Sequence, residues 1–175
     1  MQLSIPDPCL VVLMGAAGAG KSTFAARHFD PSEVLSSDAY RAQISGDPAN
    51  QAVTRAAFGR LHRELGRRLA AGELTVVDAT NLETAARRAL LQRSNAAGMP
   101  AVAILLDLPE VIVLARNAAR IHRVVDVAVV RNHLARLRAV IDRSATGLLV
   151  EGFASVVVLR DPLELEEVTV VRVAR

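Results

Sequence analysis

The chain has 175 residues and a formal net charge of +3, a length that fits one domain and a charge too small for nucleic-acid binding through the bulk electrostatic field. Hydrophobic residues make up 51% of the chain and aromatic residues only 3%, so we expect an aliphatic core and no stacking of bases on aromatic platforms. Any contact with a nucleic acid must then depend on where the arginines lie.

The sequence shows no sign of secretion or of a membrane span. Cys9 is the only cysteine, which excludes an internal disulfide and suits a reducing compartment. No leader peptide opens the chain, and Asp107 and Pro109 interrupt the longest apolar stretch before it reaches the ~18 residues of a spanning helix. We therefore expect a cytoplasmic protein with no membrane partner, and the sequence leaves the oligomeric state open.

A glycine-rich loop, GAAGAGKS at residues 15–22, follows the apolar stretch Leu10–Met14 and precedes a helical pattern from Thr23 to Phe29. In this setting backbone N–H groups and the helix N-terminus hold phosphates, while the lysine reaches the outer phosphates and the serine hydroxyl binds Mg²⁺. The loop therefore predicts a site for a nucleoside triphosphate. Its expected binding residues are Gly15, Ala17, Gly18, Ala19, Gly20, Lys21, Ser22 and Thr23.

Two alternatives to this interpretation are a glycine turn that binds nothing and a dinucleotide site. Lys21 is the only lysine of the chain, whereas every other long cation is arginine, so a compact ammonium group is particular to this position. The dinucleotide fingerprint G-x-G-x-x-G starts at neither Gly15 nor Gly18. Binding of a nucleoside triphosphate is the interpretation that the loop favours.

Four further apolar stretches read as continuous rather than alternating, which is typical of strands covered on both faces. Helical patterns separate them, and strands that alternate with helices indicate an α/β fold with a parallel five-stranded sheet between helices. The four stretches are Val34–Ser37, Leu74–Val77, Ala101–Leu106 and Ser155–Leu159.

Capping residues predict where the helices begin and end. The expected boundaries are a helix from Asp47-Pro48 to Gly72, one capped by Thr80 or Asn81, one from Pro109 to about Arg123, and one capped by Asp126. The final segment, Leu163–Arg175, is expected to hold a short helix and a last strand.

Acidic residues follow two of the predicted strands. Asp38 comes after Val34–Ser37 and Asp78 after Leu74–Val77, and in a parallel sheet the ligand lies outside the carboxyl ends of the strands. Either residue could be a helix cap or a turn residue, but beside the glycine loop both are expected within reach of the phosphates. Asp78 is followed by Ala79 and not by a second carboxylate, which argues against a hydrolytic motor.

Asp38 and Arg41 are the candidates for an acceptor site. They are three residues apart and would lie on the same side of a following helical turn. A carboxylate that accepts a hydroxyl proton, next to an arginine that holds an anion, is what a kinase needs on its acceptor side.

Arg116, Arg120 and Arg123 are spaced by four and by three, so we expect them on one face of a helix. A solvated arginine face is the alternative, but few acidic residues stand near enough to pair with them. Unpaired guanidinium groups after the fourth strand indicate a lid, at about residues 109–143, which closes over the phosphates and neutralises the charge of the transferring group.

A second basic set lies in the helical region 49–71 and is expected to be a solvated surface, although its role stays open. Gly59 and Gly66 in this region each cost about 1 kcal/mol relative to alanine, which close packing or the approach of a ligand would explain. The basic set is Arg55, Arg60, Arg63, Arg67 and Arg68.

The histidines show no spacing that fits a metal site, and no cysteine partners them, so zinc is not expected. They are His28, His62, His122 and His133, of which His122 lies in the arginine-rich stretch and could touch a phosphate.

Several motifs stand in a characteristic order: GAAGAGKSTF at residues 15–24, Ser36-Ser37-Asp38-x-x-Arg41, TVVDATN at residues 75–81, and Arg116-x-x-x-Arg120-x-x-Arg123. Together they resemble the 5′-kinase domain of the bacterial polynucleotide kinase-phosphatases of RNA repair. The likeness runs over nearly the whole chain, to Glu151-Gly152-Phe153 before the last core strand.

The resemblance implies an adenylate-kinase-like P-loop fold that transfers the γ-phosphate of ATP or another NTP to a 5′-OH end of RNA or DNA. Preferences for RNA or DNA and for the NTP base stay open. On the acceptor side the resemblance implies that Asp38 is the general base and that Arg41 contacts the acceptor. On the donor side it implies phosphate contacts for Lys21, Ser22 with Mg²⁺, Arg116 and Arg123, and a less defined contact for Arg120. Asp78 would support the water shell of the metal or order the loop.

We expect residues 1–175 to form one P-loop kinase domain, free-standing or part of a larger repair protein, because members of that family continue into phosphatase and ligase-type domains. If the domain is free-standing, its acceptor is uncertain. The alternatives are a small-molecule or toxin-type kinase on the same fold, and an NTP-binding switch module without catalysis.

Overall fold

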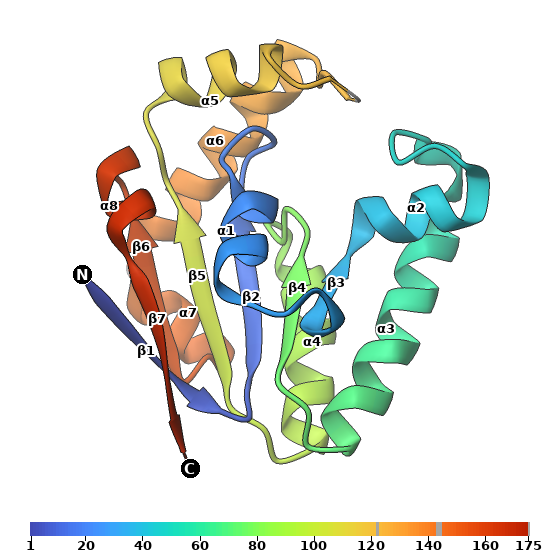
Figure 1. Cartoon of the computed structure of the whole chain (residues 1–175), viewed down its shortest axis with the longest axis vertical. Coiled ribbons are helices and arrows are strands. Elements are labelled where there is room, and N and C mark those ends of the chain that lie inside the picture. The colour runs from blue at the N-terminus through green and yellow to red at the C-terminus, as the bar shows by residue number, and fades with distance from the viewer. Residues whose placement is uncertain (122, 143–144, 175) are drawn as a thin grey trace.

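The computed structural model describes residues 1–121, 123–142 and 145–174, so His122 lies outside the described residues. A five-stranded parallel sheet in the order β3-β4-β2-β5-β6 forms the centre of the molecule (Figure 1). The predicted α/β fold is confirmed, and each predicted strand agrees with the structure to within one residue at either end. The strands are β2 (Leu10–Gly15), β3 (Val34–Ser36), β4 (Thr75–Asp78), β5 (Ala101–Leu106) and β6 (Ser155–Leu159).

The sheet is covered on both faces, as its continuous apolar strands predicted. Successive residues of a strand point to opposite faces, and accordingly Val11 and Leu13 join one buried cluster while Val12 and Met14 join the other. Helices α1, α5 and α8 pack into the first cluster, α3, α4 and α7 into the second, and α6 into both. None of the helices in the described part of the chain is long and apolar enough to cross a membrane. The helices are α1 (Lys21–His28), α2 (Ser37–Ser45), α3 (Thr54–Ala70), α4 (Thr84–Ala96), α5 (Glu110–Ala118), α6 (Val127–Asp142), α7 (Ala145–Glu151) and α8 (Pro162–Glu167), with 3₁₀ turns at Pro31–Glu33 and Gln51–Val53.

The two ends of the chain pair with each other. The strand β1 (Gln2–Asp7) runs parallel to β7 (Thr169–Ala174) and forms a separate two-stranded sheet, visible beside β5 and β6 in Figure 1. The short helix and last strand expected in residues 163–175 are present as α8 and β7, but the sequence analysis did not find β1. Leu3 and Ile5 of β1 are buried in the first cluster, so this small sheet closes one side of the core.

The prediction that a helix begins at Asp47-Pro48 is wrong. The carboxylate of Asp47 accepts a hydrogen bond from the N–H of Ala49 at 2.7 Å and closes a local turn instead. The turn leads into the 3₁₀ segment, and α3 begins only at Thr54.

The prediction that Thr80 or Asn81 caps a helix is also wrong, because α4 begins at Thr84. Asn81 adopts a left-handed backbone conformation with φ of 51°, which asparagine tolerates better than most residues. Its side-chain amide donates to the carbonyl of Leu13 at 2.8 Å. Asn81 therefore ties the end of β4 to the end of β2, directly below the glycine loop.

The expected helix from Pro109 to Arg123 is shorter than predicted, because α5 ends at Ala118. Asn117 is 1% exposed. Its side chain accepts a hydrogen bond from the N–H of Val125 at 3.1 Å and donates one to the carbonyl of Val125 at 2.7 Å. These two bonds fold the following segment back toward the sheet. The prediction that Asp126 caps the next helix is correct, since its carboxylate accepts from the N–H of Ala128 at 2.7 Å and α6 begins at Val127.

Candidate active site

The glycine loop lies between β2 and α1, as the sequence predicted. Gly18 and Gly20 have φ of 86° and 96°, and Gly20 is the N-cap residue of α1. A Cβ atom on Gly18 would lie 2.5 Å from the carbonyl oxygen of Val113 in α5, so only glycine fits at this position. The loop thus packs closely under the first helix of the predicted lid.

Lys21 folds back over this loop. Its Nζ atom donates to the carbonyl of Gly15 at 3.0 Å and to that of Ala16 at 2.8 Å. Burial lowers the pKa of Lys21 below its ordinary value, while the nearby carboxylate of Asp78 raises it in opposition. A bound polyanion would therefore stabilise the charged form of this buried ammonium group.

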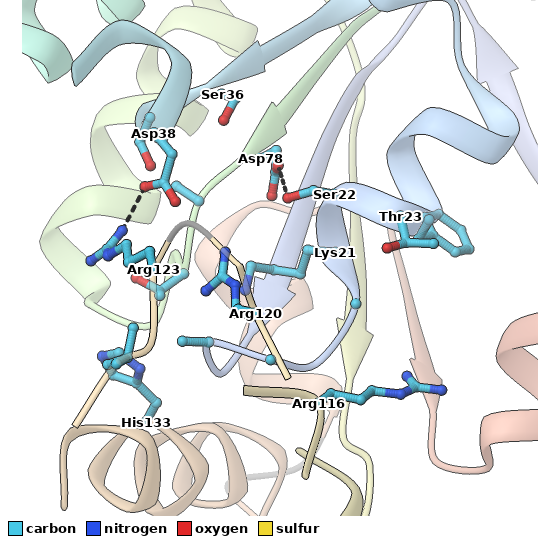
Figure 2. A pocket seen from close by; sticks show the side chains of 18 of the residues that line it. Lys21, Ser22, Thr23, Ser36, Asp38, Asp78, Arg116, Arg120, Arg123 and His133 are labelled. Carbon is cyan, nitrogen blue, oxygen red and sulfur yellow. Dashed lines mark hydrogen bonds and ion pairs between the residues drawn. The ribbon is translucent and has the colours of Figure 1, made fainter. Parts of the chain in front are cut away.

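Ser22 and Asp78 form the second polar contact of the loop. The hydroxyl of Ser22 donates to Oδ2 of Asp78 at 2.7 Å, which joins the start of α1 to the end of β4 (Figure 2). Oxygen ligands of this kind suit Mg²⁺, which usually keeps several waters and binds phosphates together with one or two protein groups. Among the described residues no group of three or more His, Cys, Asp or Glu could hold a metal by itself.

Asp38 lies in the first turn of α2, two residues beyond the end of β3. Its Oδ1 accepts a hydrogen bond from Nη1 of Arg41 at 2.6 Å and another from Nη1 of Arg123 at 2.8 Å. Asp38 and Arg41 thus lie on the same side of a helical turn, as the sequence predicted, and they also form an ion pair, which was not predicted. Arg41 is buried and also donates to Oγ1 of Thr54 at 3.3 Å, which ties α2 to the start of α3.

The lid arginines do not share one helix face, contrary to the prediction. Arg116 lies on α5, whereas Arg120 and Arg123 lie in the segment that Asn117 folds back between α5 and α6. In Figure 2 Arg120 lies beside Lys21, Arg123 points at Asp38, and Arg116 extends to the other side of the loop. The three guanidinium groups nevertheless line one cavity.

That cavity has a volume of about 790 Å³ and holds most of the predicted site residues. Gly15 and Ala19 belong to the loop but do not line the cavity, because both are buried. Ala17, Gly18 and Gly20 of the loop do line the cavity, and such small residues leave backbone N–H groups accessible to an anion. The predicted residues that line it are Ala17, Gly18, Gly20, Lys21, Ser22, Thr23, Asp38, Arg41, Asp78, Arg116, Arg120 and Arg123.

Sequence reasoning missed the far side of the cavity. Phe58 of α3, Val129 of α6 and His133 of α6 line it. Burial lowers the pKa of His133, with Lys21 and Arg123 adding to the effect, and its Nδ1 atom is buried without a hydrogen-bond partner in the described part of the chain. Only the spacing of α6 could have signalled His133, because it lies three residues after Val130 and one before Leu134, both buried.

A glycine loop at the end of the central strand, with a lysine, a serine and a carboxylate around it and three arginines lining the same cavity, defines a P-loop kinase-like domain. This class of fold binds a nucleoside triphosphate. The chain belongs to the AAA domain family, whose pattern matches residues 10–144. The search of curated proteins found no match to this chain.

Solved structures of similar fold include several kinds of P-loop protein. A chain of the Pnkp1/Rnl/Hen1 RNA repair complex is 19% identical with a TM-score of 0.66, over 79% of this chain and 47% of its own length. A gluconokinase from Sinorhizobium meliloti 1021 is 20% identical with a TM-score of 0.55, over 93% and 88%. The PezAT toxin-antitoxin system of Streptococcus pneumoniae contains a chain that is 16% identical with a TM-score of 0.58, over 91% and 70%. Identities this low show a shared fold and leave the acceptor to be identified.

Proposed function

We propose that the chain is a 5′-polynucleotide kinase domain that transfers the γ-phosphate of ATP or another NTP to the 5′-OH end of RNA or DNA. The observation that carries the proposal is the position of Asp38. Both of its arginine partners bind Oδ1, and in the described part of the chain Oδ2 has no hydrogen-bond partner. One oxygen is thus fixed in place while the other is available to an alcohol.

The donor side of the reaction falls to the glycine loop. Its N–H groups and Lys21 hold the β- and γ-phosphates, and Arg116 and Arg120 contact the phosphates from the lid side of the cavity. Magnesium bound at Ser22, with Asp78 behind it, would neutralise part of the phosphate charge. The protein residues supply position and electrostatic stabilisation, which is most of what phosphoryl transfer requires.

The acceptor side falls to Asp38. Its free Oδ2 takes the proton of the 5′-hydroxyl while the hydroxyl oxygen forms a bond to the γ-phosphorus. The bond from the γ-phosphorus to the oxygen that bridges it to the β-phosphorus breaks, and the nucleoside diphosphate is released. Arg41 and Arg123 hold the carboxylate at the angle this transfer needs. Arg123 also brings positive charge next to the transferring group.

A nucleoside acceptor is supported by the far wall of the cavity. Phe58 and Val129 give it apolar surface, which suits the face of a base better than it suits a sugar acid covered with hydroxyl groups. The motifs around Asp38, Asp78 and the lid arginines also resemble the kinase domain of RNA repair proteins. We further propose that residues 1–175 are one kinase domain with its lid at about 109–143.

The test is to supply γ-labelled ATP with Mg²⁺ and, in parallel reactions, a 5′-OH oligonucleotide, the same oligonucleotide already carrying a 5′-phosphate, and gluconate. We expect label on the first substrate only. Asp38→Asn should lower the rate by about 10³-fold while the affinity for ATP changes little. Transfer to gluconate and not to the oligonucleotide would identify a small-molecule kinase, and ATP binding without any transfer would identify a switch module.

A further inference from the structure

The outward face of α3 differs from an ordinary solvated helix face. Residues 55, 59, 62 and 66 follow one another at spacings of four, three and four, so they lie along one stripe of the helix. We name this stripe and its two flanking side chains the α3 track. It consists of Arg55, Phe58, Gly59, His62, Arg63 and Gly66.

The positive charge of the track is uncompensated. Arg55 and Arg63 are exposed, and neither forms an ion pair with any residue that the structure describes. Arg67, farther along α3, behaves differently, because it binds both carboxylate oxygens of Glu64 at 3.1 Å or less. Two guanidinium groups on the track are therefore available to an external anion.

The two glycines of the track are not required by packing. A Cβ atom on Gly59 or on Gly66 would meet no atom within 4 Å, and neither glycine has the left-handed backbone that would call for it. Their cost of about 1 kcal/mol each relative to alanine has no compensation inside the fold. What they provide is bare helix backbone, between Arg55 and Arg63 at Gly59 and beyond Arg63 at Gly66, over which an extended chain can pass closely.

Flat rings lead from this surface to the active-site cavity. Phe58 lines the cavity, and its ring centroid is 6.2 Å from that of His62 one turn further along α3. Burial, with Arg93 nearby, lowers the pKa of His62. The track is thus continuous with the acceptor wall, and α3 extends from there away from the lid (Figure 1).

We propose that the α3 track binds the acceptor strand beyond its terminal nucleoside, as single-stranded nucleic acid. Its backbone phosphates contact Arg55 and Arg63. Contrary to the expectation from the low aromatic content, a base near the end of the strand stacks on Phe58 and His62. The inference rests on the proposed function and extends it: the acceptor is recognised as a strand several nucleotides long, and the basic region is a binding surface and not only a solvated one.

The experiment measures binding and transfer separately on the whole chain. Fluorescence anisotropy gives the Kd of a 5′-OH dinucleotide and of a 5′-OH 12-mer, and steady-state kinetics gives KM for both. We expect the 12-mer to bind the unaltered protein more tightly than the dinucleotide does. R55Q/R63Q should weaken 12-mer binding about tenfold and reduce the slope of log K against log salt by about 0.7 for each arginine, with the dinucleotide KM unchanged within about twofold.

The matched control is the double variant R60Q/R138Q, which also removes two exposed arginines. Arg60 points away from the stripe on α3 and Arg138 lies on α6, so this variant should retain the preference for the 12-mer. An equal loss in R55Q/R63Q and in the control, or a Kd that does not depend on strand length, would overturn the track. The binding arm stands without catalysis: if the 12-mer is bound through Arg55 and Arg63 but never phosphorylated, the track holds and the proposed kinase activity fails.

Discussion

The donor side and the acceptor side of the cavity are held together by contacts of very different range. On the donor side, Lys21 reaches carbonyls only six and five residues before it, so one continuous stretch of sequence forms the loop and occupies it. On the acceptor side, Asp38 is fixed by an arginine 85 residues further along the chain. The contacts of Lys21 within the phosphate cradle are therefore local, although Ser22 also reaches Asp78, 56 residues away. Asp38 combines a local partner, Arg41, with a distant one, Arg123, whose position depends on where the segment after α5 lies.

This difference separates two kinds of defect. Changes in the glycine loop should affect everything that follows from nucleotide binding. A change at Arg123, in the segment between α5 and α6, should spare the nucleotide and affect the alcohol, because Arg123 binds the acceptor carboxylate.

The largest effect is expected from Lys21→Ala. Loss of the ammonium group removes charge stabilisation of the transferring phosphoryl group, and kcat/KM should fall about 10³-fold or more. The measurement is the rate of label transfer to a 5′-OH oligonucleotide, with circular dichroism as the check on folding. Lys21→Arg is the control for charge alone: it should also lose most activity, because a planar guanidinium cannot occupy the place of a compact ammonium group. Activity of Lys21→Ala within tenfold of the unaltered protein would refute this donor side.

A double-mutant cycle tests the acceptor side. Arg123→Ala should lower kcat about 10²-fold with little change in the affinity for ATP, because its guanidinium holds Asp38 at 2.8 Å. In the Asp38→Asn background the same substitution should cost less than about threefold. Additive losses would instead place Arg123 on the donor phosphates, which is the role that the sequence resemblance implies.

The contrast in range also explains how much of the site the sequence could predict. Residues 10–29 specify a strand, a glycine loop and a helix within twenty positions, and the structure contains each of them. The placement of Asp38 and Arg41 on one side of a helical turn is a short-range feature and agrees with the prediction, whereas their ion pair was not predicted. These features need no knowledge of distant residues.

The errors lie where a distant or unusual hydrogen bond overrides a local preference. Spacing placed Arg120 and Arg123 on a helix, but the bonds of Asn117 with the backbone of Val125 end that helix at Ala118. The sequence predicts Asn81 as a helix cap, yet its side-chain amide donates a hydrogen bond to the carbonyl of Leu13, 68 residues away. Likewise β1 forms only because β7 meets it from the other end of the chain.

An ion pair between the buried Arg87 and the partly exposed Glu151 supports the next prediction. Arg87 is 2% exposed, binds the carboxylate of Glu151 at 2.6 Å, and donates to the carbonyl of Leu82 at 2.7 Å. Glu151→Ala leaves this guanidinium buried without its counter-charge, so the free energy of unfolding should fall by about 3 kcal/mol. Urea unfolding measures it. The control Glu167→Ala removes an exposed carboxylate and should stay within about 0.5 kcal/mol of the unaltered protein. Equal values for the two variants would mean that Arg87 does not stabilise the fold through Glu151.

The smallest effect is a dependence of stability on pH. Burial lowers the pKa of His28, His62 and His133 below the ordinary value of 6.5, so between pH 7 and pH 5.5 the unfolded chain binds more protons than the folded one. The free energy of unfolding is then largest above pH 7 and falls as the pH drops through 6.5 toward the lowered values. Urea unfolding at steps of pH should show this fall, and His133→Gln should make it shallower.

His133 also connects this pH dependence to the two sides of the cavity. The charges of Lys21 and Arg123 help to lower its pKa, and a triphosphate held by the glycine loop would offset both. Bound nucleotide should therefore raise the pKa of His133 and reduce the loss of stability at low pH. The His133→Gln variant, which has no proton to gain there, should show a smaller difference between its slopes with and without nucleotide. If nucleotide changes the slope equally in both proteins, His133 does not sense the donor phosphates, and the link between the two sides runs through Arg123 and Asp38.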